Sequence, residues 1–158
     1  LQSALEFDDN DQLEESHPVV GIVQALAETT DPINYAPYWF DRSPHWDGQP
    51  MSLLMTEGLL DQQTPPATAE ALAAAGQVPI LIPTAHLSTA HSLADDGIDE
   101  SPALLNRKSY AGTMVTAGLA QFGDEDHFAI FYNEKAADLY LNFLETALDG
   151  GTPWISEH

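Results

Sequence analysis

The sequence contains no cysteine and very little positive charge. Four basic residues stand against 25 acidic ones, so the 158-residue chain carries a formal net charge of −21. Binding to nucleic acid through its phosphates needs clustered lysine and arginine side chains, which four basic residues cannot supply. An anionic membrane surface is an unfavourable partner for the same reason. The lack of cysteine excludes disulfide bonds and thiol chemistry but leaves the cellular compartment open.

Long apolar runs and targeting patterns are also missing. No apolar run reaches the roughly 18 residues that a membrane-spanning helix needs. Hydrophobic residues make up 44% of the chain, which is usual for a globular protein. The chain begins Leu1-Gln2-Ser3, without a basic segment followed by an apolar one. We therefore expect a processed or truncated product whose targeting signal would lie upstream.

The pattern of apolar residues predicts alternating helices and strands. Apolar residues at helical spacing predict helices over 19–27, 68–75 and 133–148. Short apolar runs predict core strands over 51–56 and 113–122, whereas the prolines in 78–83 predict an edge strand or none. Residues 84–109 are predicted to form a long loop. A strand–loop–helix order that occurs twice is typical of the end of a parallel α/β sheet.

An acidic and aromatic segment precedes the first predicted strand. Within the polar residues 1–16, Asp8-Asp9-Asn10-Asp11 is a calcium candidate that lacks the glycine and terminal glutamate of an EF-hand loop. Between residues 33 and 50, five aromatic residues lie among three prolines, namely Tyr35, Tyr38, Trp39, Phe40 and Trp46. Their simplest interpretation is packing between a cap and the core. The alternative is an apolar wall for an acyl or polymer substrate.

Two reactive side chains follow the two strongest predicted strands. Asp61 comes shortly after the first strand, and His127 follows the second at the end of Gly123-Asp124-Glu125-Asp126. Reactive groups in open α/β sheets collect at the carboxyl ends of strands, so the two side chains can meet there. The carboxylate would orient the imidazole, leaving its other nitrogen as a general base. Asp126 is interpreted as part of a solvated acidic loop, or alternatively as a charge that raises the pKa of His127.

Two more histidines lie in the predicted long loop. His86 and His91, together with Asp95 and Asp96, could form a metal site. A spacing of five residues between the histidines fits no common zinc pattern, however, so no metal is expected there.

The segments around Asp61 and His127 carry a resemblance to a known family. Residues 53–72 read LLMTEGLLDQQTPPATAEAL and residues 126–131 read DHFAIF. In this order they resemble the acid-bearing and histidine-bearing segments of bacterial α/β-hydrolases of the lipase and esterase type. Residues 23–26 and 31–37 resemble a segment that follows the cap in large secreted members. The resemblance covers residues 17 to about 155.

The resemblance implies a fold, a division of the chain and roles for individual residues. The fold would be α/β, namely the C-terminal half of an α/β-hydrolase with a mostly parallel sheet flanked by helices. Residues 1–50 would be an acidic terminus and a cap-associated helical and aromatic segment, and residues 51–158 the C-terminal part of the core. Asp61 and His127 would be catalytic. Tyr38, Trp39 and Phe128 would bind substrate, and neither a cofactor nor a metal is implied.

One part of the family pattern is missing from this chain. The motif G-x-S-x-G, which carries the serine nucleophile, does not occur, and the earlier oxyanion-hole segment is absent too. Ser43, Ser52 and Ser88 do not stand on a predicted strand-to-helix elbow. The expected partner is therefore the N-terminal half of the same enzyme, as a separate or cleaved chain that carries the serine.

The resemblance implies an esterase or lipase, complete only with its N-terminal half. The expected substrates are small apolar esters or polyesters, and the expected location is secreted or extracytoplasmic. A non-catalytic α/β-hydrolase-like interaction domain is one alternative. A peptidase or amidase of the same fold is another, since fold alone does not choose the reaction.

Overall fold

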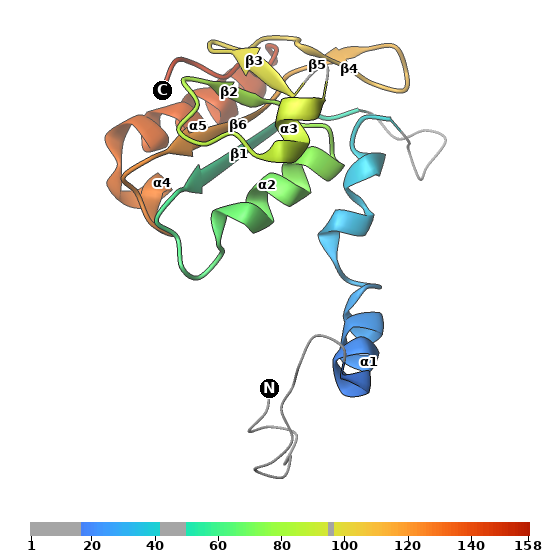
Figure 1. Ribbon diagram of the computed structural model, residues 1–158. Helices are drawn as coiled ribbons and strands as arrows, with labels where there is room; N and C mark the ends of the chain where they lie inside the picture. The colour runs from blue at the N-terminus through green and yellow to red at the C-terminus, as the bar shows by residue number, and fades with distance from the viewer. Residues whose placement is uncertain (1–16, 42–49, 95–96) are drawn as a thin grey trace.

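The centre of the molecule is a four-stranded parallel sheet flanked by helices. The computed structural model describes residues 17–41, 50–94 and 97–158. The strand order is β1 (Leu53–Gly58), β6 (Ala117–Phe122), β2 (Ile80–Ile82) and β3 (Ile98–Glu100). Helix α2 (Pro66–Ala75) lies on one side of the sheet and α5 (Glu134–Leu148) on the other (Figure 1). The expected α/β fold class is confirmed at this level.

Smaller elements surround this sheet. They are α1 (Pro18–Ala27), the 3-10 helices η2 (Pro32–Asn34) and η3 (Ala36–Tyr38), α3 (Thr89–Leu93), α4 (Ala129–Tyr132), and the antiparallel pair β4 (Arg107–Lys108) and β5 (Met114–Val115). Helix α1 lies apart from the sheet and buries none of its residues (Figure 1). Among the described residues, no helix is long and apolar enough to cross a membrane.

Side chains along the strands point alternately to the two faces of the sheet, and each face carries a separate apolar core. On the α2 side, buried residues are Phe40, Ala73, Val78, Ile80, Val115, Ala117 and Leu119. On the α5 side, they are Leu81, Ala103, Ala120, Phe122, Ala136, Leu139 and Ile155. Because successive side chains of a strand point to opposite faces, odd-numbered positions of β6 face α2 and even-numbered ones face α5. Both faces of the sheet are therefore covered, as parallel sheets require.

Strand β2 differs from the sequence prediction. The prolines in 78–83 led us to expect an edge strand or none, yet β2 lies inside the sheet between β6 and β3. The strand is only three residues long, so Pro79 and Pro83 flank the ladder rather than interrupt it. Pro79 needs no N–H here because it contributes its carbonyl oxygen, 2.8 Å from the N–H nitrogen of Leu119.

The long loop predicted for residues 84–109 holds regular structure as well. It contains α3, β3 and the first strand of the small antiparallel pair. Ser88 supplies the N-cap of α3, a local signal that the sequence interpretation passed over. The predicted strand 113–122 divides at Thr116 into β5 and β6. The predicted helices over 68–75 and 133–148 and the strand near 51–56 are confirmed within about two residues.

Strand β1 is paired on one side only. It runs parallel to β6 over its whole length, from Leu53 beside Ala117 to Gly58 beside Phe122. Among the described residues, no strand lies along its other side. The sheet therefore ends in an open, six-residue parallel strand that carries one of the two predicted catalytic residues just beyond its carboxyl end.

Candidate active site

The predicted catalytic residues meet beyond the carboxyl ends of two neighbouring strands. The Nδ1 atom of His127 donates a hydrogen bond to Oδ2 of Asp61 over 2.8 Å. Asp61 follows β1 and His127 follows β6, and these strands are paired in parallel. The Asp61 side chain is 10% exposed, whereas the His127 side chain is 38% exposed. With Nδ1 engaged, Nε2 is the nitrogen left to accept a proton.

Backbone hydrogen bonds hold the two loops against each other. The N–H of Leu59 donates to the carbonyl of Phe122 over 3.0 Å, and the N–H of Leu60 donates to the carbonyl of Glu125 over 2.9 Å. Gly58 permits this approach, because a Cβ at its position would lie 2.3 Å from the carbonyl oxygen of Asp126. The glycine that the sequence places at the end of β1 therefore determines how closely the two loops approach.

The Asp61 carboxylate is stabilised by the start of its own loop. Its Oδ1 accepts the N–H of Gln63 over 2.7 Å and that of Thr64 over 2.9 Å. Desolvation alone would raise the pKa of Asp61, but these hydrogen bonds, together with the one from His127, outweigh it and lower that pKa. The carboxylate therefore stays ionised and can stabilise a positive charge that forms on His127.

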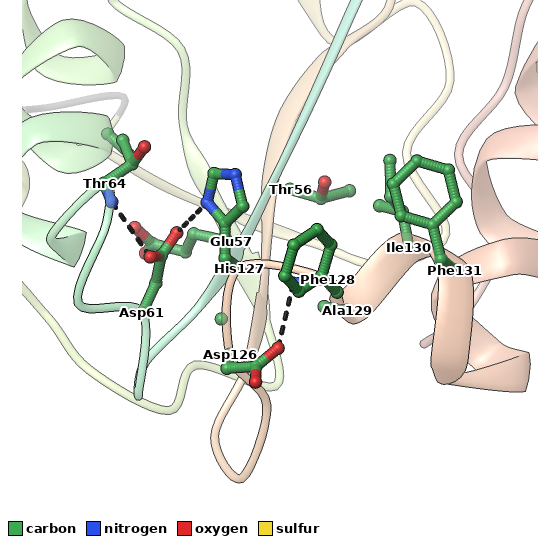
Figure 2. Close-up of a pocket in the computed structure, with 12 residues that line it drawn as sticks. Thr56, Glu57, Asp61, Thr64, Asp126, His127, Phe128, Ala129, Ile130 and Phe131 are labelled. Atoms are coloured by element: carbon green, nitrogen blue, oxygen red, sulfur yellow. Dashed lines mark hydrogen bonds and ion pairs between the residues drawn. The ribbon is translucent and has the colours of Figure 1, made fainter.

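An open cavity of about 320 Å³ surrounds this pair. Figure 2 shows Asp61 and His127 at one side of the opening, and Ile130 and Phe131 at the other. The Phe128 ring stands edge-on to the His127 ring, with ring centroids 5.1 Å apart. Asp126, which also lines the cavity, accepts the N–H of Phe128 over 2.9 Å. One side of the cavity is thus polar and reactive, and the opposite side is apolar.

The structure brings only part of the predicted substrate-binding set to this cavity. Phe128 lies in its wall, whereas the described lining includes neither Tyr38 nor Trp39. Trp39 packs against Gly76 and the core on the α2 side, and Tyr38 is 40% exposed at the end of η3. The buried ring of Phe40 supports the packing interpretation of the aromatic segment. Trp46 lies outside the described residues.

The serines considered as nucleophiles have other roles or lie elsewhere. Oγ of Ser52 accepts the N–H of Thr116 over 3.0 Å just before β1, at the opposite end of that strand from His127. Ser88 caps α3, and its Oγ lies 2.7 Å from Nδ1 of the buried His91. Ser43 lies outside the described residues. Neither described serine supplies a nucleophile to His127.

The histidines considered as metal ligands are engaged in other contacts. Nε2 of His91 lies 3.1 Å from the carbonyl oxygen of Val78, and its Nδ1 faces Ser88, so both ring nitrogens are engaged. Burial lowers the pKa of His91, which favours its neutral form. Across residues 17–41, 50–94 and 97–158, no three side chains form a metal-binding group. Asp95, Asp96 and the acidic run Asp8 to Asp11 fall outside those ranges.

Sequence reasoning missed a second histidine–carboxylate pair close to the first. Nδ1 of His86 lies 2.5 Å from Oε1 of Glu70, a buried residue of α2. Glu57, which lines the cavity, is buried at the end of β1 and accepts a hydrogen bond from Gln121. The glutamate that directly follows the apolar run 51–56 was the one signal in the sequence that could have pointed to this group.

Comparisons with known proteins add no assignment. No protein family, no curated protein and no solved structure matches this chain. The geometry of the site is therefore the basis on which a function can be argued.

Proposed function

We propose that this chain supplies the acid and the base of a serine ester hydrolase. The observation that carries the proposal is the hydrogen bond from Nδ1 of His127 to Asp61, beyond the carboxyl ends of two parallel strands and beside a cavity. Asp61 orients the imidazole and stabilises its protonated form, and Nε2 of His127 moves the proton. The nucleophile is a serine on another polypeptide, the N-terminal half of the same enzyme.

The reaction has two balanced halves. In the first, Nε2 of His127 takes the proton of the serine hydroxyl as its oxygen bonds to the ester carbonyl carbon. The same proton then passes to the departing alcohol, which leaves an acyl-enzyme. In the second, His127 takes a proton from water, whose oxygen attacks the acyl carbonyl, and returns that proton to the serine. A carboxylic acid is released, and no cofactor is needed.

The open edge of β1 is the place proposed for the missing serine. A strand added in parallel along this edge would end beside the cavity, where reactive loops of parallel sheets gather. The cavity lining includes Thr56, which points toward the α5 side of β1, and Ala69, which lies on α2. The cavity thus reaches both faces of the sheet at the end of β1. A serine elbow after the added strand would face Nε2 of His127.

The cavity wall favours apolar esters. Ile130 and Phe131 line it opposite the reactive pair, Phe128 lies beside His127, and Phe131 is 68% exposed (Figure 2). Acylglycerols, short-chain esters and aliphatic polyesters fit such a wall, because their acyl chains can be buried on it. A secreted or extracytoplasmic location is part of the same proposal, and its support is the resemblance to secreted hydrolases.

Intact-mass spectrometry of the isolated protein, combined with a fluorophosphonate probe, tests the proposal. We expect a second polypeptide bearing G-x-S-x-G to accompany this chain, and the probe to label its serine. The complex should hydrolyse p-nitrophenyl butyrate, and the labelled complex should not.

A folded monomer of this chain, without a labelled serine, would contradict the proposal and favour a non-catalytic interaction domain. Labelling together with hydrolysis of p-nitroanilides, but not of esters, would instead favour the peptidase or amidase alternative. The probe reports the serine and the two substrates report the reaction, so each alternative gives a different result.

A further inference from the structure

A chain of polar contacts lies on the α2 side of the sheet, at the edge of the cavity. Glu57 of β1 and Gln121 of β6 are register partners, and Nε2 of Gln121 donates to Oε1 of Glu57 over 2.6 Å. Oε1 of Gln121 accepts the N–H groups of Ala85, at 3.0 Å, and His86, at 2.9 Å. Nδ1 of His86 contacts Oε1 of Glu70 over 2.5 Å. The network therefore joins β1, β6, α2 and the loop after β2.

The network buries two carboxyl groups close together. Glu57 is 7% exposed and Glu70 is 4% exposed. Oε2 of Glu57 is buried and has no hydrogen-bond partner among the described residues. Apolar side chains could fill such a position at a lower cost, because an unpartnered buried charge is strongly unfavourable. A buried polar cluster beside a reactive pair therefore points to a role in the site rather than in stability alone.

The protonation of Glu57 follows from these surroundings. The pKa of Glu57 is raised to about 7 in total. Burial raises it most, the hydrogen bond from Gln121 lowers it, nearby Glu70 raises it and His86 lowers it. The hydrogen bond to Glu70, together with the charge of that residue, raises the pKa of His86. Glu57 is thus protonated in a large part of the molecules at neutral pH, so little charge rests on its unpartnered oxygen.

Glu57 is connected to the reactive pair through the backbone. Its neighbour Gly58 is in contact with the carbonyl groups of Glu125 and Asp126, directly before His127. The N–H of Asp61 bonds to the carbonyl of Gly58 over 3.2 Å. A displacement at Glu57 therefore reaches both loops at once. Three other titratable groups line the cavity with Glu57, namely Asp61, Asp126 and His127.

We propose that Glu57 is a positioning residue, whose protonated carboxyl group holds the end of β1 in the arrangement that joins Asp61 to His127. Loss of this proton to water in the cavity leaves a negative charge on an oxygen that has no partner. The side chain then moves toward water, the end of β1 shifts, and the hydrogen bond between Asp61 and His127 weakens. The expected effect of Glu57 on catalysis rests on the proposed function. Its expected effect on the hydrogen bond between Asp61 and His127 does not.

The first test reads the Nδ1–H proton of His127 by NMR in the isolated protein, with any polypeptide that accompanies it. Glu57→Gln is nearly isosteric with the protonated acid and cannot ionise. At pH 8.5 we expect a sharp signal in Glu57→Gln and a signal broadened by exchange with water in the wild type. Because the wild type and Glu57→Gln are compared at the same pH, the titration of other groups does not account for a difference between their signals. Asp124→Asn, in the exposed part of the His127 loop, removes the same charge and should behave as the wild type.

The second test reads the pH profile of kcat/KM for p-nitrophenyl butyrate. In the wild type we expect a loss of about tenfold per pH unit above pH 7, since the protonated form is the competent one. This alkaline loss should disappear in Glu57→Gln and persist in Asp124→Asn. Equal Nδ1–H signals in wild type and Glu57→Gln at pH 8.5 would overturn the inference. If no form hydrolyses esters, the proposed function fails, while the NMR comparison still decides the role of Glu57.

Discussion

Two histidine–carboxylate pairs lie near the end of this sheet, with similar contacts and different surroundings. Nδ1 of His127 lies 2.8 Å from Asp61, and Nδ1 of His86 lies 2.5 Å from Glu70. Asp61 also accepts two backbone N–H groups, so three donors share its charge. Glu70 stands on a helix, in a buried site beside the second carboxyl group of Glu57.

The comparison shows that contact between an imidazole and a carboxylate does not by itself make a base. The hydrogen bond to Glu70 raises the pKa of His86, so that imidazole keeps its proton to higher pH and is less often in the neutral form that a general base needs. In the first pair, backbone donors hold the carboxylate, and the pair lines the cavity. The two pairs therefore differ in their position and in the other partners of their carboxylates, and the catalytic role is proposed for the first pair alone.

Removal of each imidazole should give the largest difference in activity between the two pairs. His127→Ala should lower kcat by about 10⁶-fold in the complete enzyme, the scale known for the histidine of a serine hydrolase triad. His86→Ala should cost no more than about 10²-fold, the effect of misplacing reactive groups by about 1 Å. Hydrolysis of p-nitrophenyl butyrate measures both losses. Near-normal turnover of His127→Ala would remove it from the mechanism.

Neutralising each carboxylate should also lower kcat more in the Asp61 pair than in the Glu70 pair. The difference between the pairs should be smaller than for the imidazoles. Asp61→Asn should lower kcat by about 10⁴-fold, because an amide can hold His127 in the wrong tautomer and cannot stabilise its charge. Glu70→Gln should cost no more than about 10²-fold, because Glu70 acts through its neighbours. The same ester assay measures both. A loss of only tenfold in Asp61→Asn would mean that another carboxylate is the partner of His127.

A substitution at Gly58 should affect the two pairs differently without replacing any residue of either pair. Gly58→Ala places a methyl group 2.3 Å from the carbonyl oxygen of Asp126, so the loops of Asp61 and His127 must move apart. We expect a loss of about 1–3 kcal/mol in the free energy of unfolding, measured by urea denaturation. The Nδ1–H signal of His127 should weaken more than that of His86, because His86 and Glu70 lie outside the two loops that meet at Gly58.

Gly21→Ala is the matched control for that change. Gly21 lies in α1, and a Cβ at its position would meet no atom within 4 Å from the described residues outside the helix's own backbone. Alanine there should leave both histidine signals unchanged and should stabilise the helix by up to about 1 kcal/mol. Equal losses from both substitutions would show that close packing at Gly58 does not hold the loops together.

The contact between Asp61 and His127 could be predicted from the sequence because local patterns were sufficient, and their catalytic role stays a prediction. Each residue follows an apolar strand, and the carboxyl ends of neighbouring parallel strands converge at one edge. The pair formed by Glu57 and Gln121 could not be predicted in this way. These residues are 64 positions apart in the chain, and their contact depends on the register between β1 and β6. A shift of one residue would have placed Gln121 on the other face.

Two further differences have the same origin in tertiary contacts. The prolines around β2 indicated an edge, but the pairing of β6 and β3 on either side decides its position. The aromatic segment gave no indication that Trp39 would pack against Gly76, since the fit depends on the missing side chain of that glycine. Sequence patterns that repeat every two or about four residues identify strands and helices and their ends. They do not specify which elements become neighbours.

The open edge of β1 has a consequence for self-association. An unpaired strand edge can pair with the same edge of another copy, which is a common route to aggregation. Here each copy carries a net charge of −21, so two copies repel each other as they approach. At about 1 M salt the Debye length falls to about 3 Å, and this repulsion is largely screened. The acidity of the chain thus disfavours pairing of β1 with a second copy and favours pairing with a less acidic chain.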